Sequence, residues 1–133
     1  MPSTFGCQVV KLADDVWDVI KTYLHDRMGF DATQEAREWM EENMDITPFD
    51  GGAFVAMGNE FDLFVVPEKR CKWSIRGDGI NFLNKMSKLH DTMVVRIYED
   101  NMPSLRLAKK FGFKEVSREH GLIRLENSSW AVQ

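Results

Sequence analysis

Residues 101–113 read NMPSLRLAKKFGF, and they follow the apolar run MVVRIY at residues 93–98. The apolar run predicts a strand, and the next stretch predicts a helix over residues 102–111. Pro103 is allowed in the first turn of a helix, two lysines suit the last turn, and Gly112 is a typical stop. A strand followed directly by a helix therefore forms the most clearly defined part of the chain.

Upstream, residues 76–81 read RGDGIN and lead into an expected helix over residues 79–90. A short strand, CKWSI, is expected just before them at residues 71–75. A strand, a Gly-rich loop and a helix form an arrangement that binds phosphate, because loop N–H groups and the positive helix end converge on the anion. The glycines also suit a plain turn, and the charge of Asp78 opposes a nearby phosphate. This stretch alone leaves both interpretations open.

The first half of the chain starts with a β-type run, CQVVKL, at residues 7–12. Helical spacing of apolar residues then predicts a helix over residues 14–28. A second helix fits residues 32–44, with a capping box formed by Asp31 and Gln34. Four glutamates are expected on its solvated outer face: Glu35, Glu38, Glu41 and Glu42.

Strand periodicity begins after Pro48 and the Gly-Gly pair at residues 51–52, which we expect to form a turn. The runs AFVAM and EFDLFVV flank Gly58-Asn59, which predicts a β-hairpin with a type II′ turn. Two more strands, at residues 113–118 and 122–125, end the pattern. The expected order is β-α-α-β-β-β-α-β-α-β-β, an α/β (α+β) fold with a mixed, largely antiparallel central sheet.

The composition is that of a soluble, globular protein of one-domain size. The 133 residues are 44% hydrophobic and 29% charged, with a net charge of −4 and a pI of about 5.4. This acidic balance disfavours nucleic acid as a partner, since phosphate contacts need clustered Lys and Arg. No apolar run approaches a membrane span, and the N-terminal segment does not look like a signal peptide. We therefore expect a cytoplasmic protein without a membrane partner.

The cysteines and histidines do not suggest a metal site. Cys7 and Cys71 form no CxxC pair and are expected to be reduced thiols. His25, His90 and His120 are scattered along the chain. No metal is therefore expected.

Together, RGDGINFLNKM and EDNMPSLRLAKKFGFKEVSRE resemble the GNAT superfamily of acyl-coenzyme A N-acyltransferases. That family carries R/Q-x-x-G-x-G/A at a strand-to-helix turn, and later N-x-x-A/S, a helix and K-x-G-F. The expected element order also matches the GNAT order over nearly the whole chain. The resemblance implies a GNAT-type domain over residues 1–126, with helices on both faces of the sheet, and a short tail at residues 127–133.

The resemblance implies acetyl-CoA, or another acyl-CoA, as cosubstrate. The backbone of residues 77–81 would hold its pyrophosphate, and the edge of strand 71–75 would pair with its pantetheine arm. Asn101 and Ser104 would line the far side of the groove. The implied cofactor-binding residues are Ile75, Arg76, Gly77, Asp78, Gly79, Ile80, Asn81, Asn101 and Ser104.

The catalytic residues are not assigned by the sequence. Acetyl transfer needs aligned partners, a proton acceptor for the amine, an oxyanion donor and an acid for the thiolate. The family's Tyr acid falls on Ala108, Asn81 is larger than the small residue usual there, and CKWSI contains no carboxylate. Side chains that could substitute are Tyr98, Glu99, Glu60, Glu68 and Cys71.

The helices at residues 14–28 and 32–44 would line the acceptor side, and they are rich in Asp and Glu. A basic acceptor is therefore expected, such as a lysine, a protein N-terminus or a polyamine. A homodimer is compatible with the sequence.

Two other interpretations remain open. The chain could be a catalytically degenerate GNAT-fold protein that acts as a binding or structural module, because eroded GNAT-like folds occur in tailed bacteriophages as virion-associated or host-takeover proteins. The departures at Asn81 and Ala108 suit that interpretation. A Rossmann-type nucleotide fold is the weaker alternative, since no βαβ unit with an acidic ribose ligand follows the glycines.

Overall fold

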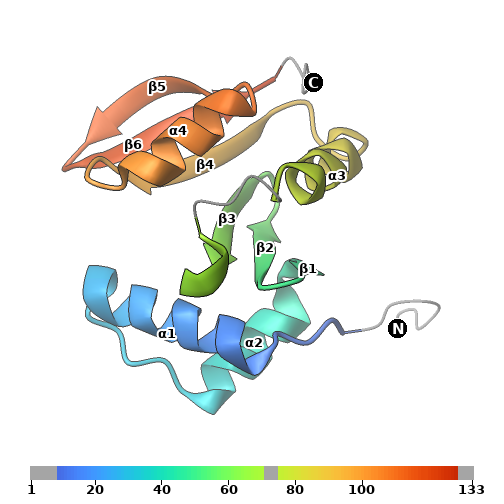
Figure 1. Ribbon diagram of the computed structural model, residues 1–133, viewed down its shortest axis with the longest axis vertical. Helices are drawn as coiled ribbons and strands as arrows, with labels where there is room; N and C mark the ends of the chain where they lie inside the picture. Colours follow the sequence, from blue (N-terminus) through green and yellow to red (C-terminus); the bar gives the residue numbers. More distant parts are fainter. Residues whose placement is uncertain (1–8, 71–74, 129–133) are drawn as a thin grey trace. The chain divides into compact units, whose positions relative to one another are not determined.

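The computed structural model describes residues 9–70 and 75–128 (Figure 1). By its internal contacts the chain forms two compact units. The first holds the described residues up to Met57 together with Leu63–Arg70. The second holds Gly58–Asp62 and the described residues from Ile75 onward.

The first unit begins with two helices, as the apolar spacing predicts. Helix α1 spans Asp14–Met28 and ends at Gly29, whose φ of 65° is left-handed. Helix α2 spans Gln34–Asn43, and its cap is the Thr33 side chain, which accepts a hydrogen bond from the Ala36 N–H at 3.2 Å. The predicted capping box of Asp31 and Gln34 is therefore wrong. Asp31 instead lies 2.8 Å from the His25 ring.

Strand β1, Asp45–Phe49, was not expected, because Pro48 and the glycines after it indicate a turn. It pairs antiparallel with β2, Gly52–Met57, with Pro48 opposite Ala53. β1 lies at the edge of the sheet, where a proline is tolerated because not every N–H has to be donated.

The predicted hairpin turn at Gly58-Asn59 is confirmed. Strand β3 follows it over Glu60–Val65, and a 3₁₀ turn, η1, follows over Pro67–Lys69. Gly58 has a φ of 62°, whereas Asn59 has no positive φ. A positive φ at the first turn position alone is the mark of type II′.

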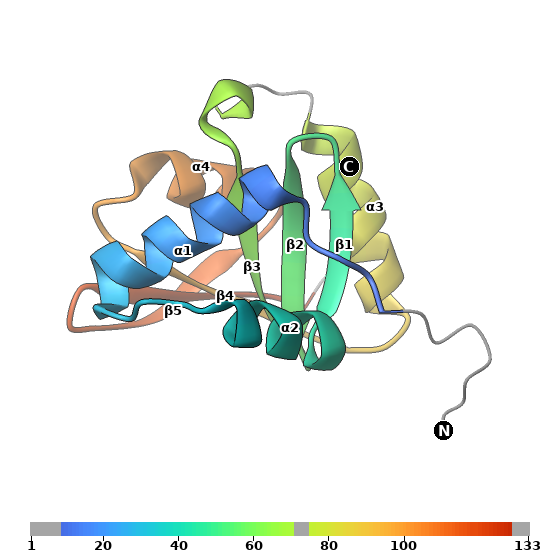
Figure 2. The same cartoon turned by 90° about the horizontal axis from the view of Figure 1, so that it is seen from below.

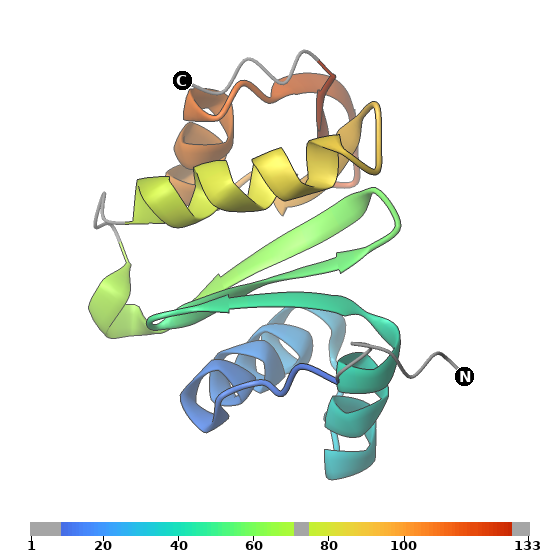
Figure 3. The ribbon, with the colours of Figure 1, turned by 90° about the vertical axis from the view of Figure 1, so that its right-hand side faces the viewer.

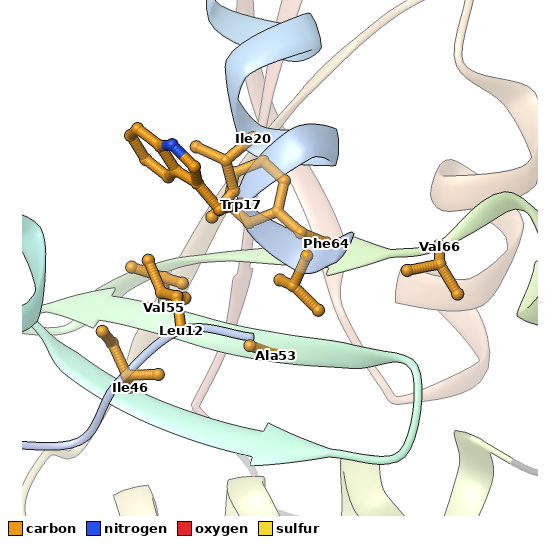
Figure 4. Packing of buried hydrophobic residues seen from close by; sticks show 9 residues of the cluster. Leu12, Trp17, Ile20, Ile46, Ala53, Val55, Phe64 and Val66 are labelled. Carbon is orange, nitrogen blue, oxygen red and sulfur yellow. The ribbon is translucent and has the colours of Figure 1, made fainter. Parts of the chain in front are cut away.

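The core of the first unit lies between α1 and the strands (Figure 2). Trp17 and Ile20 of α1 pack with Val55 of β2 and Phe64 of β3 (Figure 4). Burying one such side chain contributes about 1.5–3 kcal/mol, so this cluster fixes α1 on the strands.

The strand expected at residues 7–12 is not found where the structure describes the chain. Residues 7 and 8 lie outside the described residues, and residues 9–12 are not in a strand. The Leu12 N–H donates to the Glu41 carboxylate at 2.7 Å, and its C=O accepts from the Arg37 guanidinium. Side chains of α2 thus bind the two backbone groups that a neighbouring strand would otherwise pair.

The second unit follows the predicted pattern from Met93 onward. Its elements are α3 (Ile75–Ser87), β4 (Met93–Tyr98), α4 (Met102–Lys110), β5 (Lys114–Glu119) and β6 (Leu122–Asn127). β4 and β5 both pair antiparallel with β6. The β5–β6 turn has a positive φ at His120 (53°) and at Gly121 (78°), which is typical of type I′.

The order of the strands in the sheet is β1-β2-β3-β4-β6-β5. β3 and β4 are parallel, with Glu60 opposite Val94, and the Asn59 C=O accepts a hydrogen bond from the Val94 N–H at 2.8 Å. The pairs β1–β2, β4–β6 and β6–β5 are antiparallel. The predicted mixed, largely antiparallel sheet is confirmed.

The core of the second unit is aromatic at its centre. The Phe61 ring lies 5.0 Å from the Phe82 ring of α3 and 5.7 Å from the Phe113 ring, between centroids. Phe82 is fully buried. These contacts hold α3 on the strands of this unit.

Candidate functional site

Helix α3 begins earlier than the sequence predicts, and this changes the meaning of RGDGIN. The helix starts at Ile75 instead of residue 79, so residues 76–79 form its first turns and are not a loop before it. Of the strand expected at residues 71–75, residues 71–74 lie outside the described residues, and Ile75 is helical.

The first turn of α3 is partly exposed to solvent. The N–H groups of the first three residues of a helix, here residues 75–77, have no C=O partner within the helix. Arg76 and Gly77 are exposed, and a Cβ added at Gly77 would meet no atom within 4 Å. The backbone at Gly77 can therefore be approached from solvent.

Gly79 has a different role from the one predicted. It is buried in α3, and a Cβ at this position would lie 2.4 Å from Cζ of Phe111, the residue that caps the C-terminal end of α4. Its small size therefore permits the close packing of α3 against the end of α4 (Figure 3).

The N–H groups of Gly79, Ile80 and Asn81 lie beyond the first turn. In an α-helix each of them donates to the C=O four residues earlier, so they are not available to an anion. Ile80 is half-buried and Asn81 is exposed. Of the predicted pyrophosphate segment, residues 77–81, Gly77 is thus the residue whose N–H group has no C=O partner within the helix.

Asn101 and Ser104 lie at the other end of α4. The Asn101 side chain caps the helix by accepting a hydrogen bond from the Ser104 N–H at 3.3 Å. Nine helical residues separate Asn101 from Phe111, which corresponds to a rise of about 15 Å. The structure therefore places the Asn101 cap and the Gly79 contact at opposite ends of α4.

The predicted absence of the Tyr acid has a structural counterpart. Ala108 is buried in α4, and its C=O accepts hydrogen bonds from the N–H groups of Phe111 and Phe113. The position presents a methyl group to the core.

The candidate substitutes are dispersed. Tyr98 is half-buried at the end of β4, and Glu99 lies 3.3 Å from the Arg118 guanidinium. Glu68 is exposed in η1, and Cys71 lies outside the described residues. Glu60, the remaining candidate, lies on β3 with its carboxylate 3.6 Å from Nε of Arg96.

Asp62, two residues after Glu60, is a titratable group that the sequence analysis missed. Desolvation and, to a lesser degree, the charge of Glu60 raise the pKa of Asp62 to about 6. The residue as a whole remains exposed, so water screens part of this effect. The alternation of Glu60, Phe61, Asp62 and Leu63 was the signal, because a period of two places both carboxylates on one face.

No helix within residues 9–70 and 75–128 is long and apolar enough to cross a membrane. In the same ranges no three His, Cys, Asp or Glu side chains are grouped so that they could hold a metal ion.

No protein-family model and no curated protein sequence matches the chain. Solved structures do match it. YncA of Salmonella typhimurium, an assigned acetyltransferase whose structure holds its cofactor acetyl-CoA, matches with a TM-score of 0.69 and 14% identity, over 89% of this chain and 91% of that one.

Two further solved structures are similar. A ribosomal-protein-alanine N-acetyltransferase of Brucella melitensis matches with a TM-score of 0.67 and 13% identity, over 84% of this chain and 90% of that one. PH1933 of Pyrococcus horikoshii matches with a TM-score of 0.63 and 18% identity, over 92% and 96%. The fold of this chain is therefore the GNAT fold, as its motifs and element order predict.

Proposed function

We propose that this chain, which has the GNAT fold, binds an acyl-CoA and moves the acetyl group of acetyl-CoA to a primary amine. The observation that supports this function is the open first turn of α3. There the N–H groups of residues 75–77 have no C=O partner within the helix, and Gly77 is exposed. A helix N-terminus favours a phosphate through its dipole and its N–H groups.

Gly77 takes the role that the sequence analysis gave to both glycines. Cα–Cβ bonds tilt toward the N-terminus of a helix, so a side chain at this position would extend toward a phosphate bound there. The pyrophosphate would contact residues 75–77, with Arg76 adding a charge-assisted hydrogen bond. Asn101 and Ser104, at the end of α4 opposite to Phe111, would contact a more distant part of the same extended ligand.

A basic acceptor is supported by the charge of the first unit. The acidic side chains exposed on α1 and α2 are Asp14, Asp15, Asp18, Asp26, Glu35, Glu38 and Glu42. Such a surface attracts a cation and repels an anionic amine. The acceptor class we propose is a lysine, a protein N-terminus or a polyamine.

Calorimetric titration with acetyl-CoA, and separately with CoA, tests this function. We expect micromolar binding by the wild-type chain, and an affinity at least about 10-fold lower for Gly77→Ala, because the new methyl group obstructs the approach of phosphate. Gly77→Ala should fold normally, since its Cβ enters open space. Absence of both binding and thermal stabilisation at millimolar ligand would contradict the proposal.

Ala108 favours a second candidate function, a GNAT-fold binding or structural module such as a virion-associated phage protein. The position of the family's Tyr acid holds a buried methyl group, so thiolate protonation has no donor there. Binding of acetyl-CoA without acetylation of a lysine peptide, a peptide with a free N-terminus or spermidine would favour this candidate.

A further inference from the structure

Strand β5 forms an edge of the sheet. The strand order ends at β5, which pairs with β6 on one side (Figure 1). Within residues 9–70 and 75–128 no strand pairs with its other side, and all six residues of Lys114–Glu119 are exposed. The outward N–H and C=O groups of an edge strand can pair with a strand of another chain. β5 is therefore a surface on which such a strand can dock.

The charges of β5 are complementary to those of the same strand in reverse. The strand reads KEVSRE. When two copies lie antiparallel about a two-fold axis at the middle of the strand, Lys114 is opposite Glu119 of the partner subunit. In the same register Glu115 is opposite Arg118 of the partner subunit. Opposite charges directly across two strands stabilise the pair, and like charges destabilise it. All four charged residues of β5 thus meet a charge of the opposite sign.

A β-bulge in β5 places Lys114 and Glu119 on the same face of the sheet. In a regular strand, residues five apart point to opposite faces, because the side-chain period is two. Here Val116 has no partner on β6, so the register shifts at this residue. Lys114 lies opposite Glu126 of β6. Glu119 lies opposite Leu122, four residues from Glu126 and therefore on the same face.

The other complementary pair lies on the opposite face. Glu115 and Arg118 are opposite two β6 residues that are two positions apart, Leu125 and Ile123. A 2.9 Å ion pair between them confirms that both side chains lie on one face. Residues that oppose each other across a two-fold antiparallel pair must share a face. Both complementary pairs meet this condition, which a strand without the bulge would not meet.

The charged side chains of β5 differ in the partners that they already have. Within the described ranges, Lys114 and Glu119 have no ion pair, so each can bind a new partner. Arg118 lies 2.9 Å from Glu115 and 3.3 Å from Glu99. A second copy would extend these contacts into a network of alternating charges, and such networks contribute more than single exposed ion pairs.

Charged residues and a bulge on an edge strand usually prevent pairing with other strands. In β5 they exclude any strand whose charges do not match the sequence KEVSRE. A second copy of the same strand matches at every charged position. The charge order therefore selects this chain as the partner of its own edge.

We propose that β5 pairs antiparallel with β5 of a second copy of this chain. The contacts of Lys114 with Glu119 and of Glu115 with Arg118 are then each made twice by symmetry. This inference goes beyond the proposed function and does not depend on acyl-CoA binding. One six-residue strand from each chain makes a small interface, so we expect a weak dimer. It should be populated at about 100 µM protein and less populated at high salt.

Sedimentation equilibrium over about 5 to 500 µM protein, at low and at high salt, tests this pairing. Lys114→Glu places two like charges opposite each other at both ends of the paired strands. We expect it to raise the dissociation constant of the dimer by about 10-fold or more. Glu119→Lys should have the same effect. The double variant Lys114→Glu, Glu119→Lys restores the opposite signs and should associate like the wild type.

A matched control separates this contact from a general effect of charge. Lys88→Glu makes the same change of net charge at an exposed position that follows α3, and it should leave the dissociation constant unchanged. Thermal unfolding should show that all four variants remain folded, since the substituted side chains are exposed. A wild-type chain that stays monomeric at every concentration would overturn the proposal. A double variant that associates no better than the single variants would overturn it as well.

Amide hydrogen exchange locates the contact in the chain. The N–H groups of residues 114–119 that point away from β6 should exchange more slowly as the protein concentration rises, because a second β5 strand then binds them. In Lys114→Glu their exchange should depend far less on concentration. A dimer in which the exchange of these residues does not change would use another surface, and this result would overturn the proposal.

Discussion

Gly79 of α3 and Phe111 at the end of α4 are in such close contact that no Cβ fits between them. A Cβ at Gly79 would lie 2.4 Å from Cζ of Phe111, and Phe111 is itself buried. Gly77, two residues earlier in the same helix, has open space where its Cβ would be. Alanine substitutions at the two glycines of RGDGIN should therefore change the stability of the protein in opposite directions.

We expect Gly79→Ala to destabilise the protein by about 1–3 kcal/mol, because the added methyl group overpacks the α3–α4 contact. Gly77→Ala should stabilise it by about 0.5–1 kcal/mol, since alanine loses less entropy in a helix. Denaturant unfolding of both variants checks this pair. Equal changes in stability would contradict the packing role of Gly79. A loss of ligand binding in a Gly79 variant would therefore indicate a folding defect before it indicated the loss of a ligand contact.

Asp78 lies in the first turn of α3, where its charge opposes a bound pyrophosphate. We expect Asp78→Asn to bind acetyl-CoA several-fold more tightly, with the gain decreasing at high salt. Its stability should fall by about 0.3–1 kcal/mol, because an acidic residue favours the positive helix end. Calorimetry at low and high salt measures the first effect. Glu119→Gln, on the exposed strand β5, is the control for lost charge and should bind like the wild type.

Glu41 is buried, although the sequence predicts it on the solvated face of α2. It accepts a hydrogen bond from the Leu12 N–H and lies 3.4 Å from Nε of Arg37. Glu41→Ala should lower the free energy of unfolding by about 1–3 kcal/mol, because a buried N–H loses its acceptor. Glu42→Ala, at the next position, which is exposed, makes the same change in helix propensity. It should lower the free energy of unfolding far less. Similar losses in both variants would show that the Leu12 contact contributes little.

His25 and Asp31 form a pH-dependent contact beside the end of α1. The hydrogen bond that the His25 ring donates to the Asp31 carboxylate is the largest cause that raises the pKa of His25 above 6.5. The contribution of this contact to the stability of the fold is therefore complete below pH 6.5 and is lost as the pH rises through the raised pKa of His25. We expect Asp31→Asn to have a lower Tm than the wild type at pH 5.5 and an equal Tm at pH 8.5. A Tm difference that does not change with pH would contradict this assignment, and in the His25→Gln background Asp31→Asn should show no such pH-dependent difference.

Elements with strong periodicity could be predicted from the sequence. The buried face of each element can be recognised from the apolar stripe of α1, the alternation in β3 and the apolar run before α4. The glycine at position 58 indicates the turn in which it lies. The role of Pro48 was predicted wrongly. A proline indicates a turn unless the strand that contains it is known to lie at the edge of a sheet.

The candidate site was harder to predict, because its roles depend on partners distant in the sequence. Gly77 and Gly79 are chemically identical, and the distant Phe111 decides which of them packs. Glu41 and Glu42 differ in the same way, since Leu12 supplies the contact that buries the first.

Strand β3 contributes residues to both compact units, and the chain passes between the units at Met57, Asp62 and Arg70. If the chain is divided at any one of these points, one of the two fragments lacks part of its unit or contains part of the other unit. During synthesis the first unit has all its residues once Arg70 has emerged from the ribosome, whereas the second must wait for β6. We therefore expect the N-terminal half to acquire protection from proteolysis first on the ribosome, with Gly58–Asp62 held without its partners until the end.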